Sequence, residues 1–237
     1  MSDTEEVILS AEKISLKYHA RSGIFKKFEH TALENINFKL YRGETLGVLG
    51  RNGCGKSSLL RILAGIISPT QGEIVSEKSI RRALLTLGLG FRPDLSGRNN
   101  AILSAMLGGM PKRNAIQAID EIKEFAELGK FFDQPVKTYS AGMRARLGFA
   151  TAMKTEVDVL LIDEVLSVGD AHFRNKAQTC LRERMNRQQA VVFVSHNPHQ
   201  IEAICERVMW LEAGRVRSMG DIKTVVSAYA EFLSELN

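Results

Sequence analysis

The residues with the clearest chemistry form the run Gly50-Arg-Asn-Gly-Cys-Gly-Lys-Ser57, which separates an apolar stretch at 45–49 from a helix-like stretch at 58–64. This order predicts a strand, a glycine-rich loop and a helix. Glycines let successive backbone N–H groups turn toward an oligophosphate, and the first turn of the helix adds a partial positive charge. Lys56 would reach the outer phosphates, and the Ser57 hydroxyl would hold Mg2+. We expect the phosphate site to comprise Gly50, Asn52, Gly53, Cys54, Gly55, Lys56, Ser57 and Ser58.

Two apolar stretches farther along the chain end in polar residues. The stretch 159–162 runs into Asp163 and Glu164, and 192–195 runs into His196. Such ends are often only surface edges, but beside a phosphate loop the carboxyl edge of a parallel sheet is where ligands bind. Asp163 would coordinate Mg2+ directly or through water, and Glu164 would polarise the attacking water. The His196 imidazole would reach the terminal phosphate, although a lone histidine is more often structural.

A third segment, Tyr139-Ser-Ala-Gly-Met143, precedes a helical pattern that extends to Met153. Ser140 is a natural N-cap, and Gly142 leaves backbone N–H groups open to an anion. The segment therefore predicts a second anion-binding helix start. By itself it is a weak signal, because Ser-x-Gly caps are common.

Length and composition restrict the class of protein. The chain has 237 residues, of which 44% are hydrophobic and 25% charged, enough for one large α/β domain or two small ones. Its net charge of +5 comes from basic residues spread among acidic ones, which is weak evidence for nucleic acid. Three cysteines without CxxC spacing favour a reducing compartment and no metal site. The start is acidic and no apolar run could cross a bilayer, so we expect no secretory signal and a membrane role only through a partner.

The periodicity of apolar residues predicts mostly alternating strands and helices. Strands at 7–18 and 32–40, separated by a basic loop at 19–30, indicate an antiparallel portion before the phosphate loop. A short strand follows at 73–76, and the middle of the chain is helical at 99–107 and 113–128. The later elements are strands at 157–162, 190–194, 208–211 and 215–218 and helices at 140–153, 171–185, 199–205 and from 221. Strands alternating with helices favour a mostly parallel sheet.

Together these motifs resemble the ATP-binding cassette (ABC) ATPases over essentially the whole chain. The resemblance implies one α/β domain over 1–237, a P-loop ABC nucleotide-binding domain. It would have a mostly parallel core sheet, an antiparallel β portion and a helical subdomain at approximately 88–153. In that family 139–143 matches the signature motif, Ser167-Val-Gly-Asp170 matches the loop that crosses to the other subunit, and His196 matches the switch histidine. The cofactors implied are ATP and Mg2+.

The resemblance also implies how such a protein works. Family members act as head-to-tail homodimers, with each ATP held between the phosphate loop of one copy and the signature helix of the other. Closure on ATP and reopening after hydrolysis supply the mechanical work. Adenine stacks on an aromatic residue of the β portion, for which Tyr18 is our first choice and Phe28 the second, with core packing as the alternative for either ring.

One departure from the family pattern indicates a branch. Most members have a glutamine in the segment corresponding to 86–98, and this chain has none there. Its Leu-Gly-x-Gly-Phe run, followed by a proline and Ser-Gly-Arg-Asn, looks like the branch that exports bacterial capsule, O-antigen or teichoic acid, closest to the capsule type. Water or a backbone group would then replace the glutamine at the metal. The chain stops at Asn237, so we expect no carbohydrate-binding domain after the last helix.

The branch implies partners and a location. The chain would be an ATPase homodimer, bound peripherally to an integral membrane permease at the cytoplasmic face of the inner membrane. The lipid-linked polysaccharide would be contacted mainly by the permease, and nucleic acid would not be bound. Alternatives are the ATPase of an importer or lipid exporter, a nucleic-acid-associated ABC ATPase, and a cassette that does not hydrolyse ATP.

Two further expectations concern single residues. Lys56 and the helix start both favour a thiolate at Cys54, which would make that thiol reactive; the alternative is a small residue that only fills space. In the segment 88–98, Phe91, Pro93 and Leu95 are apolar in a glycine-rich setting and would receive a cytoplasmic helix of the permease. The alternative is that Phe91 packs into the core of the helical subdomain.

Overall fold

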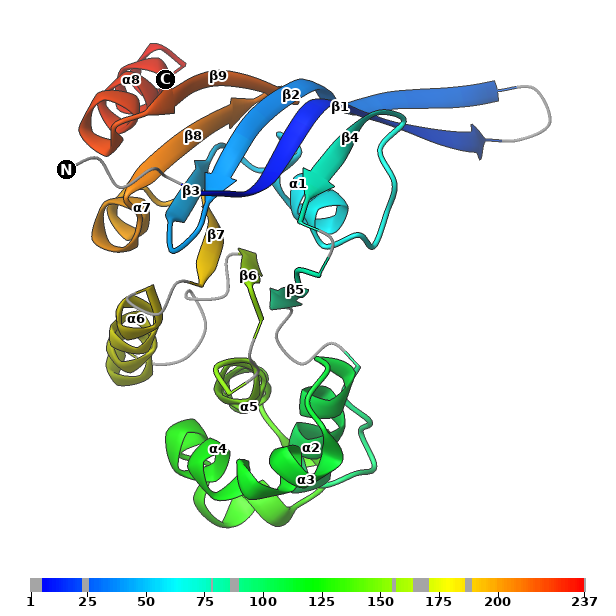
Figure 1. Cartoon of the computed structure of the whole chain (residues 1–237), viewed down its shortest axis with the longest axis vertical. Coiled ribbons are helices and arrows are strands. Elements are labelled where there is room, and N and C mark those ends of the chain that lie inside the picture. Colours follow the sequence, from blue (N-terminus) through cyan, green and yellow to red (C-terminus); the bar gives the residue numbers. More distant parts are fainter. Residues whose placement is uncertain are drawn as a thin grey trace. The chain divides into compact units, whose positions relative to one another are not determined.

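The first strands of the chain pair as a long antiparallel hairpin in the computed structural model, which describes residues 6–22, 26–77, 79–85, 90–154, 157–163, 171–185 and 189–236. Strands β1 (Val7–Ser22) and β2 (Lys26–Tyr41) pair along most of their length, and β4 (Gln71–Ser76) pairs with β1 on its other side. Figure 1 shows the hairpin extending well beyond β4. The expectation of a basic loop at 19–30 is therefore wrong, because the ladder continues through the pair His19 and Glu29.

A second sheet of the described part has the strand order β5-β6-β7-β3-β8-β9. Its members are β3 (Thr45–Leu49), β5 (Arg82–Leu85), β6 (Val159–Asp163), β7 (Ala190–Ser195), β8 (Arg207–Glu212) and β9 (Arg215–Gly220). Neighbours among β6, β7, β3 and β8 are parallel, and β9 is antiparallel to β8. Every residue of β3 and β7 is buried, which explains their continuous apolar runs.

The register of this sheet brings its carboxyl ends together. Leu49 at the end of β3 pairs with Ser195 at the end of β7, and Asp163 at the end of β6 pairs with Val194. The phosphate loop, Asp163 and the residue after Ser195 therefore leave the sheet at the same edge. This is the arrangement that the sequence predicted from strands ending in polar residues.

Three helices belong with these sheets: α1 (Lys56–Leu63), α7 (Pro198–Ile204) and α8 (Ile222–Glu235). Helix α8 begins where the Asp221 carboxylate accepts a hydrogen bond from the Thr224 N–H at 3.1 Å. It buries Val225, Val226 and Tyr229, and the Tyr229 ring lies edge-on to Trp210 of β8 with a centroid distance of 5.5 Å. The apolar face of α8 therefore covers β8.

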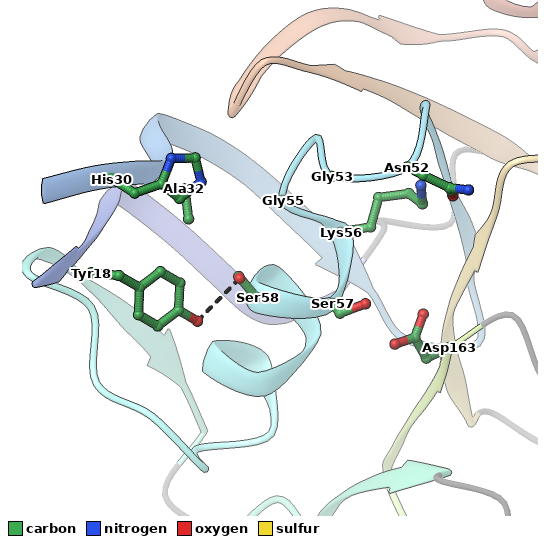
Figure 2. Close-up of a pocket in the computed structure, with 10 residues that line it drawn as sticks. All are labelled: Tyr18, His30, Ala32, Asn52, Gly53, Gly55, Lys56, Ser57, Ser58 and Asp163. Atoms are coloured by element: carbon green, nitrogen blue, oxygen red, sulfur yellow. Dashed lines mark hydrogen bonds between the residues drawn. The ribbon is translucent and has the colours of Figure 1, made fainter. Parts of the chain in front are cut away.

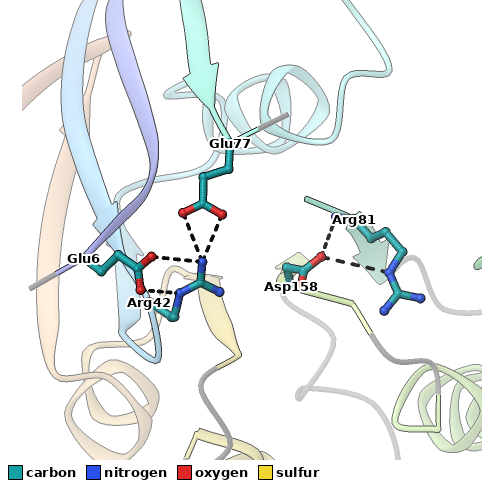
Figure 3. A network of polar contacts seen from close by, with 5 residues as sticks. All are labelled: Glu6, Arg42, Glu77, Arg81 and Asp158. Atoms are coloured by element: carbon teal, nitrogen blue, oxygen red, sulfur yellow. Dashed lines mark hydrogen bonds and ion pairs between the residues drawn. The ribbon is translucent and has the colours of Figure 1, made fainter. Parts of the chain in front are cut away.

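Ion pairs connect the ends of strands in the antiparallel sheet with the turn between β2 and β3. The Arg42 guanidinium lies between the carboxylates of Glu6 and Glu77, at 2.7 Å and 3.1 Å (Figure 3). Nearby, the Asp158 carboxylate accepts a hydrogen bond of 2.6 Å from the Arg81 N–H just before β5. These contacts connect the turn before β3 with the strand β1, and the entry to β5 with the entry to β6.

The remaining helices form a compact unit of their own. Among the described residues, one unit is drawn from 1–84, 158–164 and 184–237, and the other from 85–157 and 165–183. The second contains α2 (Gly97–Leu107), α3 (Lys112–Gln117), α4 (Ile119–Ala126), α5 (Ala141–Ala152) and most of α6 (Ala171–Met185), with 3-10 turns at Gly129–Asp133 and Val136–Thr138. The rings of Phe125, Phe149 and Phe173 meet at centroid distances of 5.9 Å and pack α4, α5 and α6 together. No helix of the described residues is long and apolar enough to span a membrane.

The Ser-Gly-Arg-Asn run at the start of α2 has a structural explanation within this unit. A Cβ atom on Gly97 would lie 2.1 Å from the Tyr139 hydroxyl, so only glycine fits. Arg98 pairs with Asp133 at 2.6 Å. The buried Asn100 amide donates to the carbonyl oxygens of 92, 95 and 96 and shapes the loop before the helix.

Two expectations for the helical region differ from the structure. The single helix expected at 113–128 is divided into α3 and α4, which meet at Ala118. Phe91 is half-buried and packs against the core that contains Phe132 and Leu147, so it is not an exposed anchor. The alternative, that Phe91 packs into the helical core, is the one that the structure favours.

Candidate functional site

Two glycines of the phosphate loop, Gly50 and Gly55, are required by close backbone contacts. Gly50 follows β3, and a Cβ atom there would lie 2.2 Å from the carbonyl oxygen of Leu211. Gly55 has φ +109°, and a Cβ atom there would lie 2.5 Å from the carbonyl oxygen of Ala32. Leu211 belongs to β8 and Ala32 to β2, so these two strands lie against the loop. Helix α1 begins directly after Gly55. The loop can pass between the two strands only because it has no side chains at these positions.

The side chain of Lys56 is held at the loop by backbone carbonyl oxygens of the loop. The buried Lys56 Nζ donates to the carbonyl oxygens of Gly50 at 2.7 Å and Arg51 at 2.8 Å. The ammonium group is thus fixed at the loop that leads into α1. The arrangement places a full positive charge beside the partial charge of a helix N-terminus, which favours an oligophosphate.

A cavity of about 200 Å³ lies in front of this loop (Figure 2). Its lining residues are Tyr18, His30, Ala32, Asn52, Gly53, Gly55, Lys56, Ser57, Ser58 and Asp163. The structure therefore brings together eight of the residues that the sequence nominated for nucleotide or metal binding, from β1, the loop, α1 and β6.

The oxygen atoms in this cavity fit Mg2+. Ser57 supplies a hydroxyl at the start of α1, and Asp163 supplies a carboxylate at the end of β6. Mg2+ is usually held by one or two protein oxygens together with phosphate oxygens and waters, so a larger protein cage is not needed. The described residues contain no cluster of three or more His, Cys, Asp or Glu side chains that could hold a metal alone.

The other predicted residues lie elsewhere or outside the described part. His196 follows β7 at the same sheet edge with an exposed side chain, but it is not among the residues that line the cavity. Ser140 caps α5 in the helical unit, where its Oγ accepts a hydrogen bond from the Met143 N–H at 3.2 Å, and Gly142 lies in the first turn. Glu164 and Asp170 and the Phe28 side chain lie outside the described residues.

Tyr18 lies at the far end of the cavity from Asp163, as Figure 2 shows. Its hydroxyl is 3.1 Å from Ser58 Oγ, and its side chain is 39% exposed. Its partner in the β1–β2 register is His30, which lines the same cavity. His30 was missed because the sequence pattern assigned 19–30 to a loop, and strand alternation alone does not give the register that pairs His30 with Tyr18.

Cys54 does not have the properties expected of a reactive thiol. Its side chain is buried, and burial raises the pKa of the Cys54 thiol, with the attraction of Lys56 too weak to reverse the effect. Burial therefore argues against the expected thiolate and favours the space-filling alternative. The Cys54 backbone has a definite role, because its carbonyl oxygen accepts a hydrogen bond from the Gly214 N–H at 3.0 Å.

That contact belongs to a support for the phosphate loop that the sequence did not reveal. The turn between β8 and β9 holds Cys54, and Arg51 of the loop forms an ion pair with Glu212 at 2.5 Å. The Arg51 guanidinium also lies over the Phe232 ring of α8 at 5.4 Å from its centroid. Residues near the end of the chain therefore stabilise the loop that begins at Gly50.

Comparisons with known proteins agree with this geometry. The model of the "ABC transporter" family matches residues 33–167. The chain is 40% identical over 211 residues to the O-antigen export system ATP-binding protein RfbB of Klebsiella pneumoniae, covering 89% of this chain and 85% of that one. It is 42% identical over 218 residues to the teichoic acids export ATP-binding protein TagH of Bacillus cereus, covering 90% of this chain but 39% of that longer one.

Solved structures show the same fold. A dimeric, post-hydrolysis structure of an ATP-binding cassette bound to ADP and Pi has a TM-score of 0.78 at 20% identity, covering 91% of this chain and 99% of that one. The structure of an ATP binding subunit of an ABC transporter has a TM-score of 0.80 at 19% identity, covering 94% and 93%. Because the family model matches over half of the residues and the Klebsiella relative aligns over most of both chains, this chain belongs to the ABC transporter family and is one of its ATPases.

Proposed function

We propose that this ATPase powers the export of a lipid-linked surface polysaccharide across the inner membrane. The observation that carries the proposal is the 40% identity, over 89% of this chain, to an O-antigen export protein, with a teichoic acid export protein at similar identity. The subunit acts as a homodimer bound to an integral membrane permease on the cytoplasmic face. The polysaccharide is contacted mainly by the permease, and nucleic acid is not a partner.

In this proposal the residues at the phosphate edge of the sheet have separate tasks. The loop N–H groups and Lys56 bind the β- and γ-phosphates of ATP, while Ser57 and Asp163 hold Mg2+, which neutralises charge on the transferred phosphoryl group. Glu164, the residue after Asp163, orients the attacking water. His196, at the same sheet edge, contacts the γ-phosphate.

The second half of the site comes from the other copy in this proposal. Ser140 and Gly142 at the start of α5 offer free N–H groups and a helix dipole to the γ-phosphate across the dimer, and Asp170 approaches the opposite subunit. At the metal, a water or a backbone group takes the ligand position that a glutamine side chain has in most members. The absence of glutamine from 86–98 supports this assignment.

Complementation of a strain that lacks the corresponding gene tests the export function. The parent chain should restore surface polysaccharide, whereas a Lys56→Ala variant should leave the lipid-linked polymer on the cytoplasmic side, because ATP is no longer bound. Immunodetection on intact and on permeabilised cells measures both pools. Normal surface polymer in the deletion strain, together with loss of uptake of a small solute or of lipid transport, would instead support another transporter class.

Tyr18 is expected to stack on adenine, since its half-exposed ring lies at the end of the cavity opposite Asp163. A Tyr18→Ala substitution should weaken ATP binding by about 1–3 kcal/mol, the range for stacking of a base on an aromatic ring. Tyr18→Phe keeps the ring and loses only the hydroxyl next to Ser58, so it should bind ATP nearly as well. Calorimetric titration with ATP compares the three proteins; equal affinities would move the stacking residue to Phe28 or remove it.

A further inference from the structure

The backbone on both sides of His196 is fastened by a buried hydroxyl. Ser195 is the last residue of β7 and is 0% exposed. Its Oγ donates a hydrogen bond to Gln200 Oε1 at 2.7 Å and accepts one from the Asn197 N–H at 3.0 Å. One side chain therefore connects the residue before His196, the residue after it and the helix α7.

The strand pairing of β7 ends one residue before His196. The ladder between β7 and β3 ends with the pair Ser195 and Leu49, so the chain leaves the sheet at His196. Beyond this point the hydrogen bond from Asn197 N–H to Ser195 Oγ fixes the turn. A serine hydroxyl has a single hydrogen, and donating it to Gln200 leaves its lone pairs directed at Asn197.

Helix α7 fixes the other end of this connection. Asn197 Oδ1 accepts a hydrogen bond from the His199 N–H at 3.0 Å, and the Asn197 carbonyl oxygen accepts from the Gln200 N–H at 3.2 Å. Ile201, on the same helix, is fully buried and anchors α7 in the core. Gln200 therefore presents its side-chain oxygen from a helix that cannot easily shift.

We infer that Ser195 and Gln200 are positioning residues, which orient His196 toward the γ-phosphate through the Ser195–Gln200 hydrogen bond. This inference rests on the proposed function, in which His196 contacts ATP. The Ser195 side chain is fully buried and hydrogen-bonded to Gln200, so both act through His196 and not on the nucleotide. Loss of the hydrogen bond should therefore slow hydrolysis without weakening ATP binding.

Steady-state ATPase kinetics of the purified full chain provide the test, with Gln200→Leu as the main variant because Gln200 is only partly buried. We expect kcat to fall on the order of 10-fold, as for other outer partners of catalytic groups, while the KM for ATP stays within about twofold. Gln200→Glu keeps an acceptor oxygen for Ser195 and should recover most of kcat. Glu202→Gln, on the same helix without contact to Ser195, is the matched control and should behave like the parent.

A double-mutant comparison separates positioning from a structural role. Once His196→Ala has removed the imidazole, adding Gln200→Leu should cause no further loss of kcat, whereas damage to the fold would add its own loss. Thermal melting checks that each variant is folded. Parental kcat in Gln200→Leu, additive losses in the double variant, or a parental rate in His196→Ala would each overturn the inference. A failure of the proposed export function would look different, since it would appear in the complementation experiment and leave these kinetics unchanged.

Discussion

Replacing Glu164 with glutamine is expected to leave ATP binding intact and to lower hydrolysis by on the order of 10²–10⁴-fold, the usual contribution of a general base. Glutamine keeps the shape of the side chain but loses the basic oxygen that orients the water. Glu164 directly follows Asp163 in the sequence, and Asp163 lines the cavity. Because closure on ATP would no longer be followed by hydrolysis, ATP-bound dimers should accumulate.

Two measurements on the same sample test the prediction for Glu164→Gln. Phosphate release measures turnover, and size-exclusion chromatography with and without ATP measures the dimer. Glu231→Gln, an exposed substitution of the same type on α8, is the matched control and should retain the parental rate. Hydrolysis by Glu164→Gln at close to the parental rate would show that another group activates the water.

The second large effect is expected for Gly50→Ala. The added methyl group would lie 2.2 Å from the Leu211 carbonyl oxygen and 2.7 Å from Cys54 Sγ, so either β8 or the loop must move. Such overpacking costs about 1–3 kcal/mol of unfolding free energy. Displacement of the loop also moves the N–H groups that face the phosphates, and ATP binding should fall below detection.

Gly53→Ala separates crowding from loss of backbone freedom. A Cβ atom at Gly53 would have no neighbour within 4 Å, but its φ of +82° is unfavourable for alanine. We expect a cost of about 1 kcal/mol, with ATP binding retained. Urea unfolding and calorimetric ATP titration measure both quantities. If Gly50→Ala bound ATP as tightly as the parent, the close contact with Leu211 would not constrain the loop.

Local patterns in the sequence predicted most of the elements and the position of the phosphate loop. Ser140 was identified as an N-cap from its place before a helical pattern, and the structure confirms its hydrogen bond to the Met143 N–H. Asp163 was expected beside the phosphates because an apolar strand ends there, and the structure places Asp163 in the cavity that Lys56 and Ser57 also line. Caps, glycine-rich turns and buried strands are specified by residues close together in the chain, which is why reading the sequence finds them.

What only the tertiary structure decided depends on residues far apart in the chain. The length of the β1–β2 hairpin, and with it the place of His30 beside Tyr18, follows from a cross-strand register that spacing does not specify. Burial in the fold raises the pKa of the Cys54 thiol, although its neighbours in sequence favour a thiolate.

Contacts between distant parts of the chain also determine the surroundings of Phe91, Gly50 and Ser195. Phe91 packs against a core whose members come from helices later in the chain. Gly50 must be glycine because of Leu211, and Ser195 is held by the side chain of Gln200 on the next helix. In each case the residue type came from the sequence, but its burial, its hydrogen-bond partner or its clearance depends on a contact that exists only after the sheets and helices have packed.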